Sequence, residues 1–151
     1  MNGEDIQFLK NLLYSEENGS FIREIENIKN PLFLHIISAN YNWNNGLDVP
    51  KAILDNRNCD FGTGLLIFYS ADGYRLLESQ GSVLDSPLKD WQKFLTNLYK
   101  KLLDGDFSTR SISFIPPLTK VQTFKLKKAN PNIPDLFLNK SPGDEVEIPI
   151  L

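Results

Sequence analysis

The residues of this sequence that could do chemistry are few, and His35 and Cys59 come first among them. Each is the only residue of its type in the chain, so a Ser–His–Asp or Cys–His nucleophilic site would have to include one of them. His35 lies inside the apolar run "LFLHIIS", which favours a hydrogen-bonded histidine in or beside the core. Cys59 has no neighbouring group that would lower its pKa, so we expect a buried, unreactive thiol. One His and one Cys also fall short of the usual ligands of a zinc site.

Three aspartates, Asp48, Asp60 and Asp72, recur at a spacing of twelve residues. Two or three carboxylates that converge could perform acid–base chemistry or bind a hard cation. Each also lies at an expected turn or helix start, where an Asp side chain accepts hydrogen bonds from exposed backbone N–H groups. We expect caps and turns here, and we predict no catalytic residue, no cofactor and no metal ligand. A small enzyme that uses these aspartates or His35 remains the alternative.

Helical periodicity of apolar residues predicts about six helices, all before residue 106. Asn30 and Pro31 are suited to the cap and the first turn of the third, and Asp48 to the cap of the fourth. The fifth, "TGLLIFYSA", is apolar on nearly every side, as is typical of a buried central helix, with Asp60 or Thr63 as its cap. The sixth has Ser86 as its expected cap and Gly105 as its expected end.

The character of the chain changes after Phe107, since six of the nine prolines lie beyond it. The stretches "SISFI", "VQTFKLK" and "VEIPI" resemble short strands in their alternation. We therefore predict a mainly α, compact single domain, 1–151. It would consist of a helical body, 1–106, and a Pro-rich, strand-like segment, 107–151, that forms a small C-terminal β segment or an extended arm.

A net charge of −3 and a pI of about 5.2 argue against a dedicated nucleic-acid-binding protein, which usually has a basic face. The lysines of "KVQTFKLKK", namely Lys125, Lys127 and Lys128, could contact nucleic acid, but lysines also protect an exposed edge strand. No run of about 20 apolar residues could span a membrane, and the first residues do not resemble a signal peptide. We expect a cytoplasmic protein with neither nucleic acid nor membrane as its partner.

Two kinds of residue could contact a protein partner: an aromatic residue at a turn, and the acidic residues of the N-terminal 30 positions. Trp43 lies in "YNWNNG" and could anchor an interface, because it buries a large area at little entropic cost, or could plug one end of the core. Residues 1–30 carry a net charge of −3. The candidate partner-binding residues are Glu16, Glu17, Glu24, Glu26, Trp43 and Asp48.

The stretch from Leu34 to Leu77, "LHIISANYNWNNGLDVPKAILDNRNCDFGTGLLIFYSADGYRLL", resembles an uncharacterised bacterial family, domain of unknown function 4274. The resemblance rests on the order and spacing of a few short motifs. These are Asn42-Trp43, Asn45-Gly46, Pro50 with Ile53, Cys59-Asp60, "GTGLLIFY" and Asp72-Gly73. The chain departs from the family pattern at Gly64, where the resemblance implies alanine.

The resemblance implies no reaction and no catalytic residue. It does imply a habit, because small acidic bacterial proteins of this kind are often encoded beside toxins as their immunity partners. We therefore predict a non-catalytic, protein-binding module, most concretely an immunity protein that neutralises a toxin domain by direct stoichiometric binding. A basic nuclease is the class of toxin that an acidic partner suits. A housekeeping regulatory or structural domain is the further alternative.

Overall fold

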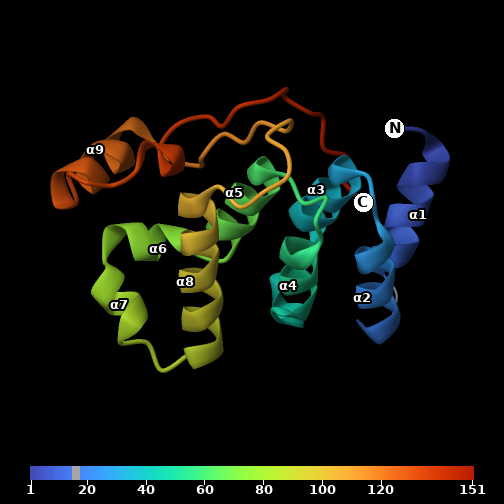
Figure 1. The fold of residues 1–151 in the computed structure, drawn as a ribbon, viewed down its shortest axis with the longest axis horizontal. Helices are drawn as coiled ribbons and strands as arrows, with labels where there is room; N and C mark the ends of the chain where they lie inside the picture. The colour runs from blue at the N-terminus through green and yellow to red at the C-terminus, as the bar shows by residue number, and fades with distance from the viewer. Residues whose placement is uncertain (15–17) are drawn as a thin grey trace.

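The structure of the chain is a computed structural model that describes residues 1–14 and 18–151. Over these residues the chain forms nine α-helices and two short 3₁₀ helices, with no strand (Figure 1). The helices are α1 (Gly3–Leu13), α2 (Asn18–Asn27), α3 (Pro31–Asn40), η1 (Trp43–Asn45), α4 (Asp48–Asp55), α5 (Phe61–Ser70), α6 (Gly73–Glu78), α7 (Gln80–Leu84), α8 (Lys89–Asp104), α9 (Lys120–Ala129) and η2 (Asp135–Phe137). The prediction of a mainly α fold is confirmed.

Several helix ends follow directly from local sequence. The Asn30 side chain accepts a hydrogen bond from the Leu32 amide, with Pro31 as the first residue of α3. The Asp60 carboxylate caps α5 by accepting from the Gly62 amide. Gly105 ends α8 in the left-handed region at φ 63°, a conformation that costs glycine little. These three predictions are confirmed.

The helix α5 is the centre of the molecule. Its residues from Phe61 to Phe68 are all buried, and it packs against α3, α6 and α8. At its C-terminal end the Phe68 ring lies 5.0 Å from that of Phe137, which in turn stacks on Tyr99 at 4.9 Å between centroids. A helix that is apolar on every side has no face left for water, which explains why this one is surrounded.

Two of the predicted helix starts are wrong. The cap of α4 is Leu47 and not Asp48, which lies in the first turn of the helix. The last helix of the body begins at Lys89 with Leu88 at its cap, because the Ser86 hydroxyl accepts from the Leu88 amide in a turn that precedes the helix. The prediction of about six helices also missed the short α6 and α7, which lie between α5 and α8.

The C-terminal segment contains a helix where the sequence suggested a strand. "VQTFKLK" lies in α9, which begins with a capping box in which Thr119 and Gln122 each accept from the other's backbone amide. Reciprocal caps of this kind favour a helix start more strongly than alternation favours a short strand. "SISFI" and "VEIPI" form no strand in the described residues; "SISFI" makes a single parallel bridge, from Ile112 to Asp144, which precedes "VEIPI". The segment is therefore an extended arm with one helix, so of the two predicted alternatives the structure shows the arm and not the small β segment.

The arm crosses the top of the body in Figure 1 and ends beside α1 and α3. There the Asn40 side chain donates to the Pro149 carbonyl at 3.0 Å and accepts from the Leu151 amide at 3.1 Å. The Tyr14 hydroxyl donates to the Leu151 carbonyl at 2.8 Å. The Asn40 side-chain amide thus makes two hydrogen bonds to the backbone of the arm, as a neighbouring strand would, and fixes the end of the arm beside α3.

Two glycines let the chain after α8 lie directly on α5. A Cβ atom at Gly62 would stand 1.9 Å from the Ile112 carbonyl oxygen, and one at Gly64 would stand 2.5 Å from the Phe107 ring. Gly64 is the position at which the chain departs from the pattern of the resembled family. Its missing Cβ makes room for the Phe107 ring over the buried helix.

Candidate functional site: the groove between α2 and α4

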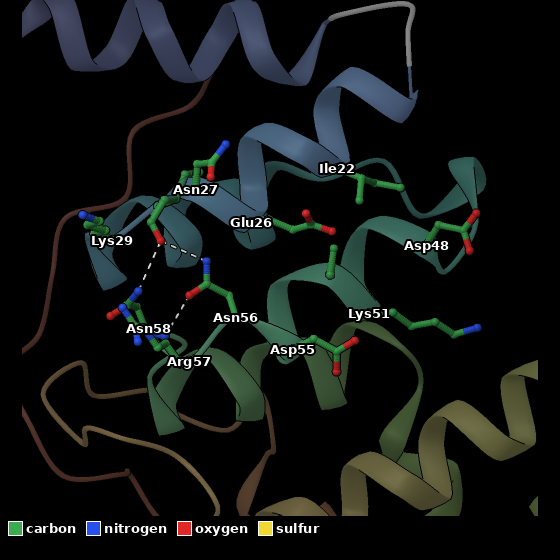
Figure 2. A pocket seen from close by; sticks show the side chains of 12 residues that line it. Ile22, Glu26, Asn27, Lys29, Asp48, Lys51, Asp55, Asn56, Arg57 and Asn58 are labelled. Carbon is green, nitrogen blue, oxygen red and sulfur yellow. Dashed lines mark hydrogen bonds between the residues drawn. The ribbon is translucent and has the colours of Figure 1, made fainter.

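A groove with a volume of about 780 Å³ lies between α2 and α4. These two helices lie side by side in Figure 1, and Figure 2 shows the groove from close by. Its lining residues are Ile22, Glu26, Asn27, Ile28, Lys29, Asp48, Lys51, Ala52, Asp55, Asn56, Arg57 and Asn58. A groove of this size between two helices is a common place for a segment of another molecule to bind.

The groove combines an apolar floor with a charged rim. Ile22 and Ala52 are half-buried and pack against the core, whereas Glu26, Asp48 and Asp55 are exposed on its sides. In Figure 2 these three carboxylates lie around the middle and one end of the groove, and the basic residues Lys29 and Arg57 lie at the other end. Within residues 1–14 and 18–151, none of these charged side chains forms an ion pair. Their charges are therefore available to a partner.

The two walls of the groove are held in place by asparagine side chains. The Asn56 amide donates to the Ile25 carbonyl at 2.8 Å and to the Ile28 carbonyl at 2.9 Å (Figure 2 draws the second). The Asn56 side-chain oxygen accepts from the backbone amide of Asn58 at 2.8 Å. Carbonyls at the end of a helix have lone pairs left over by the helix itself, so Asn56 both caps the end of α2 and fixes it against α4. The groove is thus preformed.

A second groove lies on the other side of α4, between it and α8, with a volume of about 350 Å³. It shares Lys51 and Asp55 with the first groove and adds Asp90, Lys93 and Phe94. The outer edge of α4 therefore forms a ridge with a depression on each side. Together they make a broad surface of mixed charge over α2, α4 and α8.

The structure brings together two of the six predicted partner-binding residues. Glu26 and Asp48 face the same groove from α2 and α4. Glu24 is exposed on α2 but does not line the groove. Glu16 and Glu17 lie outside the described residues.

Trp43 lies apart from the groove and serves the core. The ring is half-buried in η1 and packs edge-on against Tyr41 at 5.6 Å and Phe94 at 6.4 Å between centroids. Of the two roles considered for Trp43, the contacts are those of a core plug.

Sequence reasoning missed Lys51 and Asp55, which border both grooves. They follow Asp48 at three and seven positions along α4, the spacing that places side chains on one face of a helix. This polar stripe lies opposite the apolar Val49 and Ile53, and it was the pattern in the sequence that could have indicated an exposed, charged face of α4.

Asp60 is completely buried and is a structural residue. One carboxylate oxygen accepts from the Gly62 and Ile112 amides at 3.2 and 3.0 Å. The other accepts from the Ser111 amide at 2.8 Å and the Thr109 hydroxyl at 3.0 Å. These hydrogen bonds occupy both carboxyl oxygens of the buried side chain, and they fasten the chain after α8 to the start of α5.

His35 and Cys59, which a nucleophilic site in this chain would need, are also buried. His35 is 1% exposed, and its Nδ1 lies 2.9 Å from the Thr63 hydroxyl. Burial lowers the pKa of His35 to about 4, although the nearby Asp60 carboxylate raises it, so the ring is neutral at physiological pH. Burial likewise raises the pKa of the Cys59 thiol to about 12. A neutral thiol away from solvent is a poor nucleophile.

The three aspartates spaced by twelve residues do not converge on one site. Asp60 caps α5, and Asp72, at φ 66°, forms the left-handed turn before α6 and pairs with Arg75 at 3.4 Å. Asp48 is exposed at the α2–α4 groove. Among the residues that the structure describes, no group of three or more His, Cys, Asp or Glu side chains is close enough to hold a metal ion.

Residues 29–103 match the family model of a domain of unknown function, DUF4274. The chain therefore carries a domain of this family, which extends from the residue before the α3 cap to the last turn of α8 and includes α4 but not α2. No curated protein and no solved structure matches the chain. Within its described part, no helix is both long and apolar enough to cross a bilayer.

Proposed function

We propose that this chain is a non-catalytic, protein-binding module that uses the surface around α4. The observation that supports this most is the preformed groove between α2 and α4, with its apolar floor and its unpaired rim charges within the described part of the chain. Helical or extended segments bind in such grooves through apolar anchors, while the flanking charges determine their register.

The ridge of α4 suits a partner larger than a peptide. A partner that covers both grooves would contact α2, α4 and α8 at once, which is the extent expected of an interface that buries roughly 1,200–2,000 Å² in total. The mixed signs of the rim favour selectivity over simple attraction, because a wrong partner would place like charges together.

The same side chains weigh against the enzyme alternative. His35, Cys59 and Asp60 are buried and occupied by internal contacts, whereas a catalytic acid or base must reach its substrate within hydrogen-bond distance. The groove, in contrast, has charged groups of both signs at a surface that solutes reach.

The specific form of the proposal is an immunity protein of the bacterial cytoplasm. It would bind a toxin domain encoded beside it and block the toxin's active site by a one-to-one complex. The net charge of −3 makes a basic nuclease the toxin class that electrostatic attraction would favour.

Co-expression with the neighbouring open reading frame tests this proposal. We expect rescue from toxicity and a stoichiometric complex in a pull-down. The variant Glu26→Lys/Asp48→Lys should weaken the complex about tenfold or more, because it places two cations at the groove. The matched control Asp85→Lys/Asp104→Lys changes the net charge equally at exposed positions away from the groove and should bind nearly as the parent does. A harmless neighbour, rescue without a complex, or equal weakening by both variants would contradict the proposal.

A further inference from the structure

The helix α9 lies in a long part of the chain that is rich in basic residues and contains no acidic residue. Residues 107–130 contain one arginine and four lysines but no acid, in a protein of net charge −3. All five basic side chains are exposed. Within residues 1–14 and 18–151, none of them forms an ion pair. The expected explanation for the lysines, protection of an edge strand, fails because this segment is a helix.

The outward face of α9 also exposes apolar side chains. Leu126 is buried and fixes the inner side of the helix against the body, whereas Val121 and Phe124 are 61% and 66% exposed. These two residues are three positions apart, so they lie on one face. A large aromatic and a branched aliphatic side chain, both mostly in water, cost free energy unless a partner covers them.

The lysines surround this apolar pair. Lys120, Lys127 and Lys128 are each three or four positions from Phe124, and Lys125 is four positions from Val121, so each lies one helical turn from an apolar residue. The face therefore has an apolar centre with cations on both sides. In Figure 1, α9 stands at the opposite end of the molecule from α1 and α2, where it is free to meet a flat surface.

We propose that the outward face of α9 docks on the surface of an anionic lipid membrane. A surface without carboxylates suits a partner of uniform negative charge, whereas most protein surfaces present both signs. Anionic headgroups fit the lysines, and the boundary between headgroups and acyl chains accepts Phe124 and Val121. Nucleic-acid phosphates would satisfy the lysines but leave Val121 in water. The helix lies on the membrane without crossing it.

Sedimentation of the full chain with vesicles tests the proposal. We expect binding to vesicles of phosphatidylcholine mixed with phosphatidylglycerol, weaker binding as salt is raised, and no binding to phosphatidylcholine alone. The variant Lys125→Gln/Lys127→Gln/Lys128→Gln should weaken binding about 100-fold, since each lysine near an anionic surface contributes about 1 kcal/mol. Phe124→Ser should weaken it about tenfold through lost apolar contact.

The matched control is Lys89→Gln/Lys93→Gln/Lys100→Gln, which removes three exposed lysines from α8. It should bind vesicles as the parent does, and circular dichroism should show that all the variants stay folded. Equal loss in the two triple variants would overturn the proposal, because binding would then follow net charge alone. Binding to a fluorescent single-stranded oligonucleotide without binding to anionic vesicles would overturn it in favour of nucleic acid.

Discussion

The contrast between His35 and Asp60 shows how burial decides the charge of a side chain. Both are almost completely buried and lie within electrostatic reach of each other. Asp60 accepts from three backbone amides and from the hydroxyls of Thr109 and Ser111, and such donors stabilise a carboxylate away from water. The His35 side chain forms a hydrogen bond with the Thr63 hydroxyl, and its burial disfavours a charged imidazole. The result is a neutral imidazole beside a fully satisfied carboxylate.

This arrangement predicts a loss of stability in mild acid. The pKa of His35 is about 4 in the folded chain against an ordinary value of 6.5. As the pH falls from 6.5 toward 4, the unfolded chain takes up a proton that the folded chain does not, so the free energy of unfolding decreases by about 3 kcal/mol. Above pH 6.5 His35 is neutral in both the folded and the unfolded chain, so it causes no loss of stability. Below pH 4 it is protonated in both, so it causes no further loss.

Urea unfolding at a series of pH values measures the effect. His35→Gln cannot titrate, so between pH 6.5 and about 5 its free energy of unfolding should vary much less than that of the parent. His35 is the only histidine of the chain, so few other groups titrate in this range. Parallel curves for the parent and the variant would show that His35 is protonated in the folded state as readily as in water.

At the scale of elements, the close approach of α5 and the segment 107–113 governs the architecture. The Phe61 amide donates to the Thr109 carbonyl at 3.0 Å, and the Asp60 carboxyl group accepts from the Ser111 and Ile112 amides. This contact needs a helix surface without a side chain at Gly62. A residue with a poor helix propensity is therefore placed in the first turn of the most buried helix, because space matters more there than propensity.

Replacing Gly62 by Ala should destabilise the fold by about 2 kcal/mol or more, since the new Cβ would overlap the Ile112 carbonyl and force the segment away. The matched control is Gly81→Ala in α7, where no atom lies within 4 Å of the added Cβ. That change should be neutral or stabilise the protein by up to about 1 kcal/mol. Thermal or urea unfolding measures both. Similar effects from the two substitutions would mean that the segment does not lie against α5 as described.

At the scale of the whole molecule, the arm completes the core of the family domain. Leu126, Ile133, Phe137 and Leu138 belong to the same buried cluster as the residues of α5 and α8. Phe137 stacks on Tyr99 and contacts Phe68, and the Tyr69 hydroxyl donates to the Phe137 carbonyl. The arm thus covers apolar surface that the matched residues 29–103 alone would leave in water.

The replacement Phe137→Ala should therefore cost about 3–5 kcal/mol in the free energy of unfolding, the range for removal of a buried aromatic ring, although Phe137 lies outside the matched domain. The control Phe124→Ala, which removes a mostly exposed ring from α9, should change stability by no more than about 0.5 kcal/mol. Chemical denaturation of the two variants measures the difference. Near-equal stabilities would show that the arm is not part of the cooperative unit.

The sequence by itself determined whatever depends on near neighbours. It identified the helical class, the caps at Asn30 and Asp60, the left-handed end at Gly105, the burial of α5, and the resemblance that the family match confirms. Each of these depends on residues within a few positions of one another. In the C-terminal segment the same reasoning failed, because the alternation of "VQTFKLK" suggested a strand where Thr119 and Gln122 start a helix.

Only the tertiary structure decided which distant residues meet. It brought Glu26 of α2 to Asp48 and Asp55 of α4, turned Trp43 toward Phe94, and buried Leu126 of α9 while leaving Val121 and Phe124 exposed. No local preference encodes these neighbours, because they result from packing all the apolar stripes into one core at once. Local hydrogen bonds and sterics determine where a helix begins and ends, whereas the shared burial of many side chains determines which of its polar faces form a site.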